Sequence, residues 1–595
     1  MSHRRPPPAA RRQRRMPATR AGQRVAAAVA AIAVGLVLPT AASAHAYLVK
    51  TVPAASVVLD SPPPNVQLTY DEAVEPRFAI ISVTDAQAQQ ETTGPATRLP
   101  ANPDTLVVPL RSHLPEGWYL IYWRAISVDG HPVSGAFTYA VGPNPGPAPK
   151  FQVPSVSATA TTPQLLVARW VMFVSVMAAI GLLVLRLVIA RPLVRRVDET
   201  TLRPLTFGFV IASIFGLIAI PVYLDFSTAN DSLRSVFDLG ALVPLFRATA
   251  FNRAIVDLEL CFALFSIAGW VAVWVDRPDR ERRSLAELIA GLGAALGAAA
   301  VLLLPGTAGH AAQTAPRGLT LGFDWVHLAA GSIWLGGLVG LLVLWRALPA
   351  RRRVRGLSVV VPRFSNVALV SVGLLAGSGV GEAVDHLPAV NALWETGYGV
   401  AILVKAGLLG VALALAAGNL LRSKPSLVVA RDRPELGGAA AGLLRRLLAG
   451  EVVVVAGVVF AAAVLSSLAP PPPAFALENS ALARVGPGRV AQTIRRDGYV
   501  LQVLVSPNKA AAPDAFALRI TKNGEPVRGA NVTLTFNHLE MQMPTQEYQL
   551  TEIQPGIYSR AAPALVMVGK WGLSFQITPV SGPPLTALIV DEANG

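Results

Sequence analysis

Three patterns of apolar and polar residues follow one another along the chain. From His45 to about Gly142, short runs such as Val66 to Tyr70, Phe78 to Val83 and Gly117 to Ile126 alternate apolar with polar side chains between Pro and Gly turns. An alternation with a period of two over roughly 100 residues predicts an all-β sandwich or barrel. The following segment, 143–164, is rich in Pro, Ser, Thr and Ala, which predicts an extended linker.

The middle of the chain, 165–469, holds apolar stretches long enough to cross a bilayer, which takes about 20 residues of helix. We count eight of them, at about 165–190, 206–224, 254–275, 285–304, 322–345, 364–384, 399–421 and 450–469. The expected structure is an eight-helix transmembrane bundle. In the sixth stretch Gly373, Gly377 and Gly381 follow the small-xxx-small pattern, which predicts a close helix contact.

The C-terminal part returns to strand-like alternation. A proline-rich linker at 470–485 is followed by runs at 499–505, 516–520 and 530–536. These runs predict a second β domain over 486–595.

The first 44 residues have the order of an export signal. Eight arginines and no acidic residue precede an apolar run from Val25 to Leu38, which ends in the small residues Ala42 to Ala44. Basic, apolar and small segments in this order are typical of a cleavable signal peptide. Cleavage after Ala44 leaves His45 as the new N-terminus.

Composition and charge agree with this organisation. Of the 595 residues 52% are hydrophobic and only 15% are charged, against about 25% charged in an average soluble domain. The signal peptide removes eight of the 15 net positive charges. The loops expected in the cytoplasm hold 19 Lys and Arg and the opposite loops hold 4. This bias orients the spans with both β domains outside the cytoplasm, and no basic surplus remains to indicate nucleic acid.

Candidate metal ligands occur at the start and near the end of the first β domain. An N-terminal His45 offers an α-amino group and an imidazole that could chelate one ion, and nitrogen ligands favour Cu(II). Asp129 and His131 stand two residues apart, so in an extended segment their side chains point the same way. Asp-Gly-His by itself is more typical of a turn, but both features together indicate a metal site. The single cysteine, Cys261, excludes an internal disulfide and CxxC metal pairs.

These residues lie in segments that resemble the periplasmic copper-binding CopC proteins. The resemblance covers 45–142 and includes His45 to Leu48, Leu68 to Glu72 and Trp123 to Gly135. It implies a Greek-key β-barrel that binds Cu(II) through His45, Asp129 and His131, with Glu72 nearby. Residues 45–142 contain no Met, so we expect no second, cuprous site in this domain.

The membrane region resembles CopD, the inner-membrane partner of CopC. The similar segments are Asp324 to Gly337, Arg363 to Gly379 and Gly397 to Lys405. This resemblance implies a multi-pass protein of the bacterial plasma membrane that moves copper through the lipid bilayer, generally inward. A copper chaperone and a reductase are the partners that such a route could require.

Ionisable and polarizable groups inside spans are costly to insert and are therefore candidates for the pathway. The orientation puts His310, His327, Glu382 and His386 at the outer ends of spans, where they could form an entry site. Deeper candidates for Cu(I) are Met172, Met177 and Cys261, although single Met and Cys residues in apolar helices more often serve packing. Lys405 and Glu451 could be structural partners or gate charges.

The last domain resembles the YtkA-like immunoglobulin-type domains, through Gly556 to Tyr558 and Gly569 to Trp571. Met541 and Met543 share one face of an extended chain, and His538 is close enough in sequence to join them. The three residues predict either a Cu(I) site or core packing.

Three functions remain open. The leading one is a copper transport protein without enzyme activity, which captures Cu(II) outside and moves copper inward in copper homeostasis or resistance. The second is a membrane electron carrier in which His327 and His310 ligate haem. The third is a copper oxidase built on the His45 chelate. No Walker A or phosphorylation motif occurs in the sequence, so ATP-driven pumping by this chain is not expected.

Overall fold

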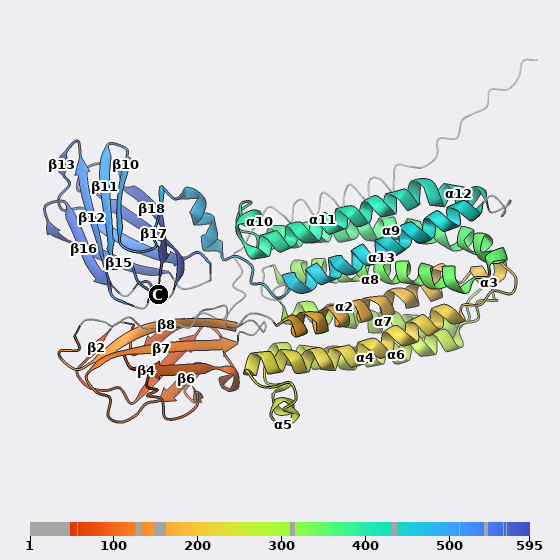
Figure 1. Ribbon diagram of the computed structural model, residues 1–595, viewed down its shortest axis with the longest axis horizontal. Coiled ribbons are helices and arrows are strands. Elements are labelled where there is room, and N and C mark those ends of the chain that lie inside the picture. The colour runs from red at the N-terminus through yellow and green to blue at the C-terminus, as the bar shows by residue number, and fades with distance from the viewer. Residues whose placement is uncertain are drawn as a thin grey trace, which may run out of the picture. The chain divides into compact units, whose positions relative to one another are not determined.

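The computed structural model describes residues 48–55, 57–126, 132–146, 162–309, 316–430, 437–510, 512–540, 545–562, 564–566 and 568–594 (Figure 1). The predicted signal peptide and the candidate ligands His45, Asp129, His131, His310, Met541 and Met543 lie outside the described residues.

The N-terminal domain pairs its strands in two four-stranded sheets, with the orders β1-β3-β6-β5 and β2-β8-β7-β4. Its strands are β1 (Leu48–Val52), β2 (Val58–Leu59), β3 (Asn65–Tyr70), β4 (Ile80–Thr84), β5 (Thr97–Leu99), β6 (Asn102–Pro109), β7 (Gly117–Ile126) and β8 (Pro132–Val141). The alternation in sequence becomes alternation in burial, since Val66, Leu68 and Tyr70 are buried whereas the residues between them are partly exposed. The predicted β fold is confirmed.

One predicted strand begins too early. Phe78 belongs to a short 3-10 helix, η1 (Pro76–Phe78), and β4 starts only at Ile80. Proline fixes φ near the helical value, which suits the first position of such a turn.

Within the described residues, eight helices are long and apolar enough to cross a membrane, and each overlaps one predicted span. They are α2 (Pro163–Val184, continued by η3, Leu185–Ile189, and α3, Leu193–Arg196), α4 (Arg203–Ser232), α6 (Ala250–Val275), α7 (Leu285–Ala308), α8 (Arg317–Ala347), α9 (Ala350–His386), α11 (Gly397–Gly418, continued by η6, Asn419–Ser423, and α12, Lys424–Val429) and α13 (Gly438–Leu465). Short helices α5 (Leu239–Leu242), η4 (Val243–Leu245) and α10 (Ala392–Glu395) lie in the connections.

The outer surface of this bundle is apolar. On α6, for example, Leu260, Leu264, Ile267 and Trp274 are each more than half exposed and recur at helical spacing. A soluble protein does not expose a stripe of this size, whereas a lipid-facing helix does. The chain is therefore a multi-pass membrane protein, as its hydropathy predicts.

Helix α2 packs against α4, α8 and α13, while α8 packs on α9 and α6 on α7. The backbones of α2 and α8 approach closely at Gly181 and Gly336. A Cβ atom on Gly181 would lie 2.0 Å from the Ser332 carbonyl oxygen, so only glycine fits there. The predicted close contact is wrong at Gly373 and Gly377, because a Cβ on either would meet no described atom within 4 Å, but it is found at Gly381, where a Cβ would lie 2.9 Å from Phe323 Cε2 of α8. A small-xxx-small spacing permits close packing but does not require a neighbour.

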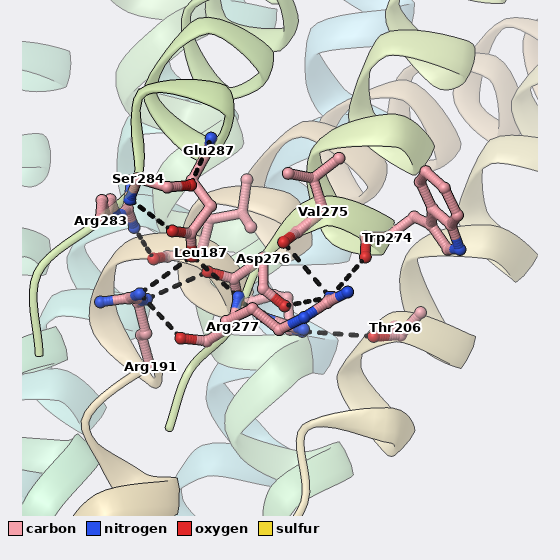
Figure 2. Close-up of polar contacts among 11 residues, drawn as sticks. Leu187, Arg191, Thr206, Trp274, Val275, Asp276, Arg277, Arg283, Ser284 and Glu287 are labelled. Carbon is pink, nitrogen blue, oxygen red and sulfur yellow. Dashed lines mark hydrogen bonds and ion pairs between the residues drawn. The ribbon is translucent and has the colours of Figure 1, made fainter. Parts of the chain in front are cut away.

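A buried ionic network joins α2, α6 and α7 at the end that the charge bias assigns to the cytoplasm. Asp276, which ends α6, accepts hydrogen bonds from Arg186 Nη1 at 2.5 Å and from Arg191 Nε at 3.0 Å. Arg191 also reaches Glu287 Oε1 at 3.1 Å, and Glu287 forms the capping box of α7 with Ser284 (Figure 2). The four charged side chains are all buried, so three helices depend on one set of charges.

The C-terminal domain follows the short helix η8 (Pro473–Ser480). Among its described residues, nine strands form one hydrogen-bonded path in the order β10-β11-β12-β16-β15-β14-β17-β18-β9, a tenth strand, β13, pairs with β12, and the strands enclose an apolar core. The strands are β9 (Ala483–Val485), β10 (Val490–Arg496), β11 (Tyr499–Ser506), β12 (Asp514–Lys522), β13 (Glu525–Pro526), β14 (Asn531–His538), β15 (Gln546–Gln554), β16 (Ile557–Ala562), β17 (Gly569–Thr578) and β18 (Leu585–Ala593). The predicted order of β domain, helical bundle and β domain is confirmed.

Candidate functional site

One end of the N-terminal domain carries the segments that flank the predicted Cu(II) ligands. Strand β1 begins at Leu48, which pairs with Tyr70 at the end of β3. Ile126 at the end of β7 pairs with Pro132 at the start of β8, so these two residues flank the segment 127–131. The rings of Tyr70 and Trp123 meet edge to face, with centroids 5.6 Å apart. This contact brings the start of β1 and the β7–β8 turn to the same end of the domain.

The packing around Trp123 leaves room for glycine alone. A Cβ on Gly135 would lie 2.7 Å from Trp123 Cζ2. The hydroxyl of Tyr70 is buried without a hydrogen-bond partner among the described residues, and burial raises the pKa of Tyr70. Glu72 follows two residues later and is half-buried. The end of the domain that flanks His45, Asp129 and His131 is thus rigid and contains an unused hydroxyl donor.

A polar cluster lies in the membrane domain where α8, α9 and α11 meet. His327 of α8 has its Nδ1 3.1 Å from Ser378 Oγ of α9 and its Nε2 3.4 Å from Lys405 Nζ of α11. An ammonium group only donates, so Nε2 accepts and the ring proton is on Nδ1. Ser378 accepts that proton and donates its own to the Leu374 carbonyl at 2.8 Å. Both nitrogens of the imidazole are therefore in use.

Two carboxylates complete this cluster. Lys405 interacts electrostatically with Glu382 and Asp324. Asp324 lies one helical turn before His327, and Glu382 lies one turn after Ser378. Formally the cluster has two negative charges and one positive charge. Glu382 Oε1 is buried and has no hydrogen-bond partner among the described residues, so the cluster has an acceptor to spare.

Two glycines let the backbone approach this cluster. A Cβ on Gly379 would lie 3.1 Å from His327 Cε1, and a Cβ on Gly306 of α7 would lie 2.4 Å from Asp324 Oδ2. The imidazole and this carboxylate are therefore held against the backbones of α9 and α7. Counted from Arg317 at the start of α8, His327 lies roughly 15 Å along the helix, well inside the span.

His386, another predicted entry residue, lies one turn beyond Glu382 at the end of α9. Its Nδ1 contacts the Glu382 carbonyl at 2.7 Å, and its ring centroid lies 6.4 Å from that of Tyr398. Ser378, Glu382 and His386 are spaced by four residues, so they follow one face of α9 from the interior to the helix end.

The predicted sulfur ligands lie in packing positions. Met172 is 3% exposed in the apolar core, and the methyl group of Met177 lies 2.9 Å from a Cβ built on Gly331 of α8. Cys261 is a half-buried free thiol on α6, whose main neighbours are α4 and α7. Met177 and Cys261 therefore lie on helices that both pack against α4 but face different second neighbours, α8 for α2 and α7 for α6.

Glu451 of α13 is buried, and both of its carboxylate oxygens are used. Oε1 accepts from Trp334 Nε1 of α8 and Oε2 from Asn419 Nδ2 of η6, each at 3.2 Å. Of the two roles left open for Glu451, these contacts favour that of a structural partner.

His538 of the C-terminal domain is 3% exposed and packs against Trp571, with ring centroids 4.8 Å apart. Its Nδ1 accepts from the Glu540 N–H at 3.3 Å, and its Nε2 lies 3.4 Å from the Val568 carbonyl. Burial lowers the pKa of His538 to about 4. These contacts favour the core-packing interpretation of this residue.

Sequence reasoning named His327 and Glu382 but missed Asp324 and Ser378 as members of the cluster. Asp324 could have been found, because a carboxylate three residues before a histidine shares its helix face. Ser378 lacked any such signal, since a serine in a span is commonly bonded to its own helix.

A CopC domain model matches residues 48–142, a copper resistance protein D model matches 358–465, and a YtkA-like model matches 496–576. Copper transport protein CutJ of Bacillus subtilis (strain 168) is 28% identical over 391 residues, which are 65% of this chain and 70% of that protein. Copper resistance protein C of Escherichia coli is 31% identical over 115 residues, which cover 90% of it and 18% of this chain.

Protein YobA of Escherichia coli (strain K12) is 34% identical over 114 residues, which cover 91% of it and 19% of this chain. A crystal structure of CopC from Methylosinus trichosporium OB3b matches 17% of this chain and 98% of its own chain, with 28% identity and a TM-score of 0.16.

Proposed function

We propose that this chain carries copper inward across the membrane. The premise is that the chain belongs to the copper resistance protein C family and continues into copper resistance protein D and YtkA-like domains. The observation that carries the proposal is the half-buried polar cluster of Asp324, His327, Glu382 and Lys405, which lies within the apolar membrane-spanning helices of a domain that follows a CopC-like domain. Such a group of charges inside a span is costly unless the protein uses it.

The capture step is assigned to the N-terminal domain on the extracytoplasmic side. His45 would hold Cu(II) through its amino group and imidazole, while Asp129 and His131 would complete the site with Glu72 nearby. The contact between Tyr70 and Trp123 supports this step, because it holds the segments that flank these ligands at one end of the domain.

The membrane step is assigned to the polar cluster, with His386 and His310 toward the outside. A metal at His327 needs the lone pair on Nε2, which faces the Lys405 ammonium at 3.4 Å. A copper ion and the ammonium cannot occupy this place together, because like charges repel strongly where water is excluded. Copper therefore enters only when Lys405 swings toward Glu382 or Asp324, so Lys405 acts as a gate.

Movement as Cu(I) requires reduction of the captured Cu(II), which we assign to a separate reductase, and delivery inside would involve a copper chaperone. In this scheme the chain is a carrier and not an enzyme.

The test is accumulation of radioactive copper by cells that express the chain. His45→Ala and His327→Ala should each abolish the increase over cells without the chain. The matched controls are His113→Ala, an exposed histidine of the same β domain, and Glu395→Gln, an exposed residue of α10. Unchanged accumulation in both His45→Ala and His327→Ala would refute the proposal.

A further inference from the structure

Three polar side chains of the C-terminal domain are completely buried beside one another. Asn508 lies in the loop between β11 and β12, Asp514 is the first residue of β12, and Asp591 lies near the end of β18. Each has 0% of its surface exposed. Asp591 shares one face of β18 with Ala587, Ile589 and Ala593, which belong to the apolar core of the domain, so Asp591 points to the core side of its sheet.

Asn508 links the two carboxylates. Its backbone N–H donates to Asp514 Oδ1 at 2.6 Å, and its side-chain Nδ2 donates to Asp591 Oδ1 at 2.9 Å. The same Nδ2 reaches the Gly488 carbonyl at 2.8 Å, and the Lys509 N–H also donates to Asp514 Oδ1, at 3.1 Å. The amide of Asn508 is therefore fixed between two aspartates that interact electrostatically.

One oxygen atom of each side chain is left over. Asp514 Oδ2, Asp591 Oδ2 and Asn508 Oδ1 are buried and have no hydrogen-bond partner within the described part of the chain. Among the described residues, no cationic side chain interacts electrostatically with either carboxylate. Buried carboxylates are normally paired with a cation or bound to a metal, so a positively charged partner is missing from the amino-acid contacts of this cluster.

We propose that Asn508, Asp514 and Asp591 form a calcium-binding site in the C-terminal domain. The available donors are all oxygen atoms, which hard divalent cations prefer, and the two carboxylates balance the charge of one Ca²⁺. Copper does not fit this donor set, because Cu(I) prefers sulfur and Cu(II) prefers nitrogen. Mg²⁺ demands near-ideal octahedral geometry, whereas Ca²⁺ accepts about six to eight oxygen ligands in flexible geometry. Both oxygens of each carboxylate, Asn508 Oδ1, the Gly488 carbonyl and water would supply those ligands.

The bound ion would fasten three separate segments of the domain. Gly488 belongs to the turn before β10, Asn508 to the β11–β12 loop and Asp591 to the C-terminal strand. Near the site the Ala510 N–H donates to the Asn594 carbonyl at 2.6 Å, which ties the same loop to the end of the chain. A Cβ on Gly488 would meet no described atom within 4 Å, so this turn offers an open approach.

The experiment uses the full chain in detergent, stripped with EGTA and equilibrated with radioactive Ca²⁺. We expect one Ca²⁺ per chain, with affinity reduced at least tenfold by Asp514→Asn and by Asp591→Asn. The matched control is Asp497→Asn, whose side chain is 76% exposed, and it should bind as the unaltered chain does. A chain that binds no Ca²⁺, which would mean that water fills the site, overturns the proposal. Ca²⁺ binding that is retained in the Asp514→Asn chain and also in the Asp591→Asn chain overturns the proposal as well.

A second measurement locates the ion without altering either carboxylate. Trp571 pairs with Asp591 across β17 and β18, and directly opposed residues project on the same face. Tb³⁺ bound in place of Ca²⁺ should therefore emit when tryptophan is excited, and Ca²⁺ should quench this emission by displacement. Trp571→Phe should remove most of the emission while Ca²⁺ binding persists. Full emission in the Trp571→Phe chain would place the ion elsewhere and overturn the proposal.

Discussion

Replacing Asp276 by Asn should weaken the contact between α6 and the end of the α2 segment, which its carboxylate holds together. The change keeps the shape of the side chain but removes the charge that faces Arg186 and Arg191. Arg191 retains Glu287 at 3.1 Å, whereas Arg186 retains only the neutral Thr206 hydroxyl at 3.2 Å. Breaking a buried ion pair costs about 3–5 kcal/mol. Because one of the two arginines keeps a charged partner, we expect the lower end, about 3 kcal/mol.

The assay is equilibrium unfolding of the purified chain in mixed detergent, followed by the helical circular dichroism signal. A loss of about 3 kcal/mol raises the unfolding equilibrium constant by roughly two orders of magnitude. Asp279→Asn, an exposed position in the same loop, should change the free energy of unfolding by less than about 0.5 kcal/mol. Equal unfolding free energies for Asp276→Asn and Asp279→Asn would refute the reasoning.

Three further predictions concern the two polar clusters. Gly379→Ala should lower copper uptake several-fold, because the new Cβ would lie 3.1 Å from the His327 ring. The control Gly373→Ala should leave uptake unchanged, because its Cβ meets no described atom within 4 Å. Lys405→Met should slow copper uptake and let the purified chain retain one additional Cu(I) in equilibrium dialysis, because the Nε2 lone pair of His327 is then open to the metal. No additional retention of Cu(I) would count against the role of Lys405 as a gate. In EGTA, amide hydrogen exchange of β18, corrected for intrinsic pH effects, should slow as pH falls from 8 to 5. Asp514 and Asp591 have folded-state pKa values raised to about 7 and 6, so the folded state binds more protons than the unfolded state and loses stability as pH rises through these values. Faster exchange at pH 5 than at pH 8 would contradict this expectation.

The fold could be predicted from sequence because its main signals are local. Hydropathy over about 20 residues identifies a span wherever it lies, and the alternation of Val66, Leu68 and Tyr70 identifies a half-buried strand. The ends of the helices were predicted less accurately. Helix α9 begins at Ala350, well before the predicted span at 364, because the arginines after Ala350 extend the helix beyond its apolar part.

The sites could be predicted only in part because they depend on contacts between distant residues. His327 and Lys405 are 78 positions apart, and no spacing rule connects them. Asn508 and Asp591 are likewise separated by 83 positions and are joined only by the sheet. Residue type alone drew attention to His327 and Glu382, since charges are rare in spans, but not to aspartates in a β domain, where most are exposed.

The central claim is tested most directly by the purified chain in liposomes that contain a Cu(I)-specific chromogenic chelator. Cu(I) is supplied outside, and the colour of the internal complex is followed in time. The account predicts that the unaltered chain produces this colour faster than protein-free liposomes do, and that His327→Ala reduces the rate to the protein-free level. Equal rates for the unaltered chain and the protein-free liposomes would contradict copper transport, and a full rate in His327→Ala would contradict the assigned route.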